Sequence, residues 1–294
     1  MTKTKAKIGL LLVTASWGVA FPLTPMVMSK GLSANTIVMF KGLLFLICCC
    51  IFFRNAITRM KRSDFLYAGL AGIGNMAGNI LQTLGMVYTT PSNCAFLTVT
   101  NVIMVPFIAL LLFREKPGKK SFLCVPLCVL GMAILTGVLQ SGIVINIGDV
   151  YSFGGAAGFA FTIALLAHGQ ADFKVIAFGL AITQFGGGLA ALLIAGESIA
   201  AAQWAFVIPA LLYLGIIATF IAASVQCYVQ KYISSTTAAL IMTMESVFGS
   251  IFSLLLGAEP FTCTLALGGL LIVLSVIFME TNLLPFWQEK HPAA

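Results

Sequence analysis

Long apolar stretches dominate the 294-residue chain and leave it few ways to fold. A helix needs about 17 to 25 mostly apolar residues to cross the hydrocarbon core of a bilayer. Short polar breaks separate ten stretches of roughly this kind: 8–28, 34–53, 65–88, 92–113, 121–139, 150–167, 174–196, 204–230, 236–256 and 261–279. Because backbone polar groups in lipid must be satisfied within the segment, each stretch is predicted to be a transmembrane helix.

The composition excludes a water-soluble globule. Hydrophobic residues make up 60% of the chain and charged residues 9%, whereas soluble domains carry about 25% charged residues. The chain is therefore predicted to be an all-α integral membrane protein with the lipid bilayer as its partner. Its eight cysteines lack the spacing of zinc or redox sites. We expect them to be buried like small hydrophobes, and we expect no metal and no cofactor.

The net charge of +7 is explained by membrane topology and requires no nucleic acid partner. If the N-terminus is cytoplasmic, the basic residues outside the spans fall almost entirely on that side, as the positive-inside rule predicts. They are Lys3, Lys5, Lys7, Arg54, Arg59, Lys61, Arg62, Arg114, Lys116, Lys119, Lys120, Lys174, Lys231 and Lys290. Only Lys30 lies on the outer side of the membrane, and Lys41 lies within a span. We expect a multi-pass protein of the cytoplasmic (inner) membrane with both termini cytoplasmic.

An internal repeat divides the chain into residues 1–145 and 146–294. An offset of 144 residues pairs rare polar residues of the same type: Gln82 with Gln226, and Glu115 with Glu259. Each half holds five predicted spans, and an odd number means that the second half enters the membrane from the opposite side. The predicted fold is therefore ten transmembrane helices in two inverted five-helix repeats. Such repeats are typical of secondary transporters that alternate access to a midplane site.

Several short motifs follow one another in the order and spacing of a known family. They are Trp17-Gly18, Phe40-Lys41 and Leu111 to Glu115 in the first half, and Leu214 to Ile216, Gln226, Ser234 to Leu240, Glu245 to Phe248 and Leu255 to Glu259 in the second. With these motifs the chain resembles the drug/metabolite transporter superfamily, in its ten-helix EamA-type branch, over nearly its whole length. Lys41 stands where members commonly carry Arg. Ser246 stands where they carry Pro after the Glu, so the ninth helix is expected to be straighter.

Two charges lie within predicted spans. Glu245 is about nine residues into its span, roughly 14 Å deep at about 1.5 Å per residue, and Lys41 is about seven residues from the outer face. The two side chains could therefore occupy similar depths. Because charges inside a bilayer are costly, both are functional candidates. Two interpretations stay open: a structural salt bridge between them, or a role in binding substrate or protons.

Polar side chains also follow one face of the third span. Asn75, Asn79 and Gln82 are spaced i, i+4 and i+7 and therefore share a helical face. The 144-residue offset aligns Asn75 and Gln82 with Thr219 and Gln226 in the eighth span. Interhelical hydrogen bonding, about 0.6 kcal/mol per bond in membranes, is one interpretation. The symmetry of the pattern favours the other, a substrate-binding cavity.

The fourth span adds Thr98 and Asn101, which share a face; Asn101 aligns with Glu245. The family resemblance implies that spans one, three, four, six, eight and nine surround a central cavity. It implies that Trp17, Phe21 and Phe161 form aromatic walls suited to an apolar or planar ligand, with ordinary helix packing as the alternative. At the cytoplasmic end of the sixth span, His168 is expected to be a solvated loop residue rather than a proton relay.

Nucleotide-binding, zinc-protease and serine-hydrolase motifs are missing from the sequence. We therefore expect a secondary active transporter, and no enzyme, that moves a small metabolite by alternating access. The resemblance favours an amino acid or a related amine. An intramembrane enzyme or lipid-handling protein is the alternative, and a passive channel is disfavoured because no ring of charges is evident. Substrate identity, direction of transport, coupling to a proton or counter-substrate, and oligomeric state stay open.

Overall fold

The computed structural model describes residues 1–89, 91–141, 146–197, 199, 203–257 and 260–281, and within them the chain is helical without β-strands. The first half contains α1 (Lys3–Met28), α2 (Ala34–Phe52), α3 (Arg54–Ile57), α4 (Arg62–Tyr88), α5 (Pro91–Val99), α6 (Asn101–Phe113), α7 (Ser121–Leu135) and α8 (Val138–Ser141). The second half contains α9 (Ile147–His168), α10 (Phe173–Ala195), α11 (Trp204–Leu212), the π-helix η1 (Tyr213–Ile221), α12 (Ala222–Val229), the 3₁₀-helix η2 (Gln230–Tyr232), α13 (Ser235–Met242), α14 (Met244–Leu255) and α15 (Cys263–Glu280).

Most of these helices are suited to a bilayer. Among the described residues, seven are long and apolar enough to cross a membrane: Lys3–Met28, Ala34–Phe52, Cys94–Phe113, Ile147–His168, Phe173–Ala195, Trp204–Tyr232 and Ser235–Leu255. Ser121–Leu135 and Cys263–Met279 are apolar but shorter. Helix α4 is 27 residues long, yet it is outside both groups because polar side chains lower its mean hydropathy. The expectation of an all-helical protein with several membrane-suited helices is confirmed.

Short polar side chains cap the N-termini of several helices. Ser33 accepts the backbone N–H of Thr36 at the start of α2. Asn146 and Asp149 form a capping box at the start of α9. Such caps satisfy backbone N–H groups that the first turn of a helix leaves without partners. Ser33 also donates to Glu197, just beyond α10, and this contact ties the start of α2 to the end of α10.

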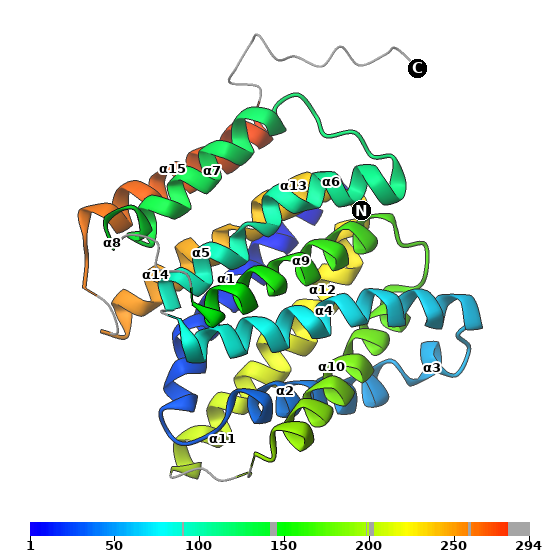
Figure 1. Ribbon diagram of the computed structural model, residues 1–294. Coiled ribbons are helices and arrows are strands. Elements are labelled where there is room, and N and C mark those ends of the chain that lie inside the picture. The colour runs from blue at the N-terminus through cyan, green and yellow to red at the C-terminus, as the bar shows by residue number, and fades with distance from the viewer. Residues whose placement is uncertain (90, 142–145, 198, 200–202, 258–259, 282–294) are drawn as a thin grey trace, which may run out of the picture.

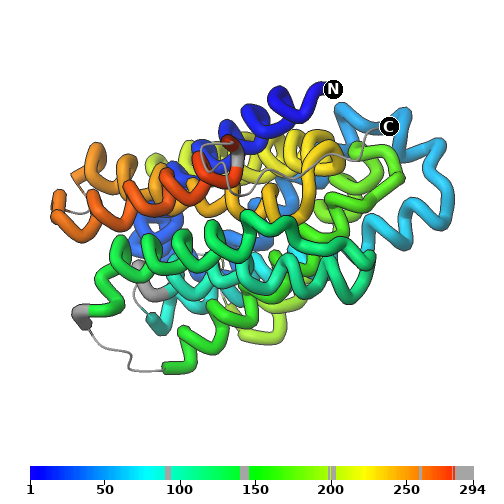
Figure 2. The backbone as a smooth tube through the Cα atoms, turned by 90° about the horizontal axis from the view of Figure 1, so that it is seen from above, coloured from blue at the N-terminus to red at the C-terminus, as the bar shows by residue number. Residues whose placement is uncertain are grey.

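The helices run alongside one another in a single bundle (Figures 1 and 2). Helix α4 packs against α9 and α10, α10 packs against α2, and α1 packs against α14. Helices α7 and α15 pair with each other at one edge of the bundle (Figure 1). The N-terminus and α3 lie at one end of the bundle, and α8 and α11 lie at the other (Figure 1). Each helix of the central group therefore contacts a helix from the other half.

Glycines bring the helix backbones into close contact. A Cβ atom on Gly158 of α9 would lie 2.7 Å from the carbonyl oxygen of Gly74 on α4. A Cβ atom on Gly18 of α1 would overlap the side chain of Phe248 and lie 2.9 Å from the backbone nitrogen of Gly249 on α14. Small residues at such crossings are what membrane helices use to pack without a hydrophobic driving force.

Two helices are interrupted at related positions. Thr100 separates α5 from α6, and Thr243 separates α13 from α14. The hydroxyl of Thr243 donates to the carbonyl oxygen of Leu240 at 2.6 Å, a local bond that often bends helices. The ninth helix is therefore interrupted at Thr243 although no proline is present there. That it is straighter than in relatives with Pro after the Glu stays a prediction.

The cysteines follow the sequence expectation in part. All eight thiols are free; six are buried, whereas Cys50 and Cys263 are exposed. The expectation of burial was wrong for these two, because both lie on outward faces of the bundle.

Candidate functional site

A cavity of about 1170 Å³, including its open mouth, lies in the middle of the bundle. Side chains from both halves line it, on α1, α2, α4, α5, α6, α9, α10, η1, α12, α13 and α14. Eleven of the residues singled out in the sequence lie on its wall: Trp17, Phe21, Lys41, Asn75, Asn79, Gln82, Thr98, Asn101, Thr219, Gln226 and Glu245. The structure thus brings together these side chains from six of the predicted spans.

The two charges within the bundle face this cavity without pairing. Among the described residues, Lys41 and Glu245 form no ion pair within 4 Å; the ammonium of Lys41 donates instead to Oδ1 of Asn79 at 3.3 Å. Glu245 lies in the first turn of α14, just beyond the interruption at Thr243. Both side chains keep partial solvent exposure because they border the cavity. Opposite charges contributed by the two halves are therefore available to a ligand.

A chain of amides links Lys41 to the opposite half. Nδ2 of Asn79 donates to the carbonyl oxygen of Asn75 at 2.9 Å. Nδ2 of Asn75 donates to Oε1 of Gln184 on α10 at 3.3 Å. Gln184 also lines the cavity, and sequence reasoning missed it. The feature that could have indicated Gln184 is that it is the one amide side chain in the largely apolar stretch 174–196.

Gln226 lines the cavity from α12. Its Nε2 donates to Oε1 of Gln230 at 2.9 Å, and Nε2 of Gln230 donates to the carbonyl oxygen of Ile163 at 2.6 Å. Nε2 of Gln226 also lies 3.7 Å from the sulfur of Met242. Gln226 therefore combines the two interpretations of the polar pattern: it faces the cavity and it links α12 to α9.

The aromatic wall differs from the expected one at a single position. Trp17 and Phe21 line the cavity from α1, and Phe159 lines it from α9. Phe161 is not among the lining residues; it packs against the apolar cluster formed with Leu165, Leu166 and other residues. The 144-residue offset aligns Phe161 with Trp17, but residues two positions apart on a helix point in different directions, and α9 turns Phe159 inward.

A π-helix forms part of the wall. Ala218 and Thr219 of η1 line the cavity. The hydroxyl of Thr219 donates to the carbonyl oxygen of Leu214 at 2.7 Å, and the indole N–H of Trp17 donates to the carbonyl oxygen of Ala218 at 2.7 Å. Such segments occur frequently at functional sites because their spacing alters which groups the backbone presents.

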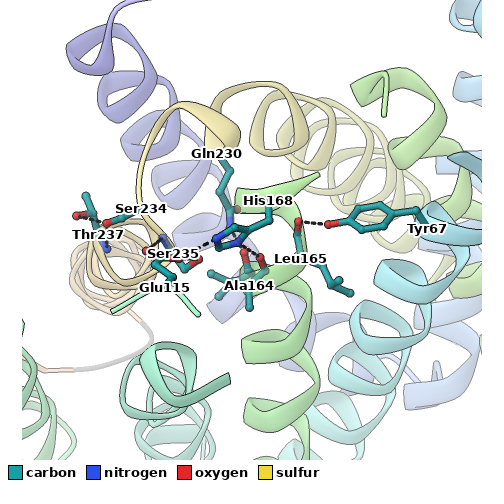
Figure 3. Close-up of polar contacts among 10 residues, drawn as sticks. Tyr67, Glu115, Ala164, Leu165, His168, Gln230, Ser234, Ser235 and Thr237 are labelled. Atoms are coloured by element: carbon teal, nitrogen blue, oxygen red, sulfur yellow. Dashed lines mark hydrogen bonds and ion pairs between the residues drawn. The ribbon is translucent and has the colours of Figure 1, made fainter. Parts of the chain in front are cut away.

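A second polar cluster lies near Gln230, where α6, α9 and α13 have their ends (Figure 3). The carboxylate of Glu115 accepts the backbone N–H of Ser235 at 3.1 Å and its hydroxyl at 2.6 Å. Nε2 of His168 lies 3.3 Å from the same carboxylate. The ring of His168 stacks on that of Phe113, with 4.0 Å between centroids. The cluster joins the ends of α6, α9 and α13, so the expectation of a solvated loop histidine was wrong.

A bundle of membrane-suited helices that encloses a polar cavity shared by two halves is the architecture of a membrane transporter. The chain belongs to the EamA-like transporter family, of the drug/metabolite transporter superfamily; the family model matches residues 4–137 and again residues 146–281. The double match shows the two-repeat architecture of that family.

One relative agrees with this assignment, and one solved structure shows the same fold. A protein of Archaeoglobus fulgidus described as an uncharacterized transporter is 32% identical over 277 residues, which cover 94% of this chain and 85% of that protein. A crystal structure of a protein with 16% sequence identity has the same fold, with a TM-score of 0.76 over 98% of this chain and 99% of that one. Family and relative indicate a transporter rather than an enzyme.

Proposed function

We propose that the protein is a secondary active transporter that moves a small metabolite across the cytoplasmic membrane by alternating access. The observation that carries this proposal is the central cavity, in which the first half contributes Lys41 and the second half contributes Glu245. Charges are costly within a bilayer and mark substrate or ion pathways. A cavity built equally by two repeats can open to either side when the repeats tilt against each other.

The proposed topology has ten crossings in two inverted repeats, residues 1–145 and 146–294, with both termini in the cytoplasm. Helix α4 and the shorter helices α7 and α15 would be three further crossings, in addition to the seven long apolar helices. The interruptions at Thr100 and Thr243 support this topology because they fall in the fourth helix of each half. Interrupted helices at corresponding positions of two halves are typical of transporter binding sites.

The proposed substrate is an amino acid or a related amine. Lys41 and Glu245 would bind groups of opposite charge, and Trp17, Phe21 and Phe159 would contact an apolar side chain. Aromatic rings give such a side chain a large contact area. A proton or a counter-substrate would be the coupling partner.

The end of the bundle carrying Glu115 and His168 would be the cytoplasmic end. The Gln226–Gln230 pair and the Glu115 cluster lie between the cavity and that end. In the opposite direction the lining reaches Thr24 and Met86, within a turn or so of the outer ends of α1 and α4. We therefore assign this conformation to the state that is closed toward the cytoplasm.

Counterflow in proteoliposomes tests the proposal. Purified protein would be reconstituted in vesicles loaded with unlabelled amino acids or amines, and uptake of the same labelled compound would be followed over time. A carrier is expected to accumulate label transiently and saturably, and to return the compound chemically unmodified. Non-saturable entry would indicate a pore, and a modified product would indicate an enzyme; either result would refute the proposal.

A further inference from the structure

The amide nitrogen of Gln184 has no partner although it is deeply buried. The side chain is 1% exposed and lines the cavity, and its Oε1 accepts a hydrogen bond from Asn75. Nε2 of Gln184 has no hydrogen-bond partner. A buried polar group without a partner costs free energy. A ligand oxygen in the cavity would supply the missing acceptor.

Lys41 lies beside Gln184 because α2 and α10 touch at this level. A Cβ atom on Gly42 would lie 2.5 Å from the backbone nitrogen of Phe185 and 2.8 Å from the carbonyl carbon of Gln184. One of the close contacts between α2 and α10 therefore lies next to Lys41 and Gln184 in both helices. The ammonium group of Lys41 has three hydrogens to donate, and its bond to Asn79 uses one of them.

The amide chain between the two residues fixes which atoms they present. Oδ1 of Asn79 accepts from Lys41, so Nδ2 of Asn79 is the group that bonds the carbonyl oxygen of Asn75. Asn75 in turn donates to Oε1 of Gln184, which leaves Nε2 of Gln184 free to donate. At this part of the wall, Lys41 and Gln184 both keep donor capacity. Two donors that line the same cavity, one of them cationic, are complementary to an anionic oxygen pair.

We propose that Lys41 and Gln184 form the carboxylate-binding end of the cavity, so that the substrate must carry a carboxylate. This inference rests on the proposed function and narrows it: an amino acid fits, and an amine without a carboxylate does not. The ammonium of the same substrate lies toward Glu245, on the α14 side of the cavity. Gln184 is then a specificity-determining residue.

Three compounds with the same side chain test the proposal. L-phenylalanine carries both charges, phenethylamine lacks the carboxylate, and 3-phenylpropanoate lacks the ammonium. Dissociation constants for all three would be measured on purified full-length protein in detergent by calorimetry. Wild type is expected to bind L-phenylalanine at least about tenfold more tightly than phenethylamine, which corresponds to about 1.4 kcal/mol.

Gln184→Glu is the informative variant because its carboxylate still accepts from Asn75 but offers no donor to the ligand. It is expected to reduce the preference for L-phenylalanine over phenethylamine to about onefold, and Lys41→Met is expected to do the same. Thr183→Val is the matched control: its hydroxyl bonds the carbonyl oxygen of Gly179, and it lies outside the cavity lining. It is expected to keep the wild-type preference.

An unchanged preference in Gln184→Glu overturns the proposal, as does a wild type that binds phenethylamine as tightly as L-phenylalanine or binds none of the three. Unfolding curves without ligand show whether each variant folds. If counterflow then detects saturable transport of amines, the carboxylate site fails while the proposed transport function stands. If counterflow detects no carrier behaviour for any compound, the proposed function fails.

Discussion

The indole nitrogen of Trp17 donates a hydrogen bond to the carbonyl oxygen of Ala218 across 2.7 Å and 201 positions of sequence. Ala218 belongs to η1, the π-helix that lines the cavity. The bond joins α1 of the first half to a helix of the second half. A cavity-lining aromatic residue therefore also bonds the main chain of the opposite wall.

Trp17→Phe is expected to destabilise the protein. The phenyl ring keeps most of the apolar contact but leaves the Ala218 carbonyl oxygen without its donor, a loss of about 1 to 3 kcal/mol for a buried group. The unfolding temperature in detergent should fall. Trp204→Phe is the matched control, because Trp204 is 41% exposed at the start of α11. Equal unfolding temperatures for the two variants would rule out a stabilising role for this bond.

Gly18→Ala is expected to separate α1 from α14. The added methyl group would overlap Phe248 and crowd the backbone of Gly249, and overpacking of this kind costs about 1 to 3 kcal/mol. Gly69→Ala serves as the comparison, because a Cβ atom on Gly69 meets nothing within 4 Å. That variant should gain up to about 1 kcal/mol from helix propensity. Thermal unfolding of both proteins measures the difference, and a stabilised Gly18→Ala would contradict the described contact.

Glu115→Ala is expected to loosen the end of the bundle where α6, α9 and α13 meet. It removes the acceptor for the N–H and hydroxyl of Ser235 and the carboxylate beside His168. Hydrogen bonds to charged groups contribute about 1.5 to 3 kcal/mol, and the partial exposure of Glu115 lowers this to about 1 kcal/mol. Amide hydrogen exchange in the first turn of α13 should quicken severalfold.

The control for that experiment is Asp64→Ala. Asp64 is a carboxylate in the first turn of α4 and accepts a hydrogen bond from the adjacent Ser63 at 3.4 Å. Removing it breaks no link between helices, so exchange in α13 should stay at the wild-type rate. Exchange that is equally slow in the Glu115→Ala protein would show that the cluster does not hold this end closed.

Much of the fold follows from the sequence because a bilayer imposes simple rules. A spanning segment must be apolar and helical along its length, so polar residues such as Lys41, Asn75 and Glu245 stand out inside the apolar stretches. These residues then had to face away from lipid, and the structure places all three on the cavity. Their positions along the chain were sufficient to identify them.

The features that the sequence does not predict depend on how each helix is rotated about its axis and packed against its neighbours. The sequence offset indicated Phe161, whereas the packing of α9 against α4 turns Phe159 toward the cavity. The π-helix could not be predicted from the residues of η1, because its Ala218 carbonyl oxygen is satisfied by Trp17 from a distant helix. Gln184 was overlooked because its significance arises from one partner, Asn75, and one missing partner.

The most direct test of alternating access requires no knowledge of the substrate. Ala20 lines the cavity, and Ala20→Cys would be made in a protein whose exposed Cys50 and Cys263 are replaced by serine. A membrane-impermeant thiol reagent would be applied to sealed right-side-out and inside-out vesicles, with the same protein lacking the Ala20 substitution as background. Alternating access predicts labelling of the new cysteine from both faces, more slowly from the cytoplasmic face. Labelling from one face only would contradict it.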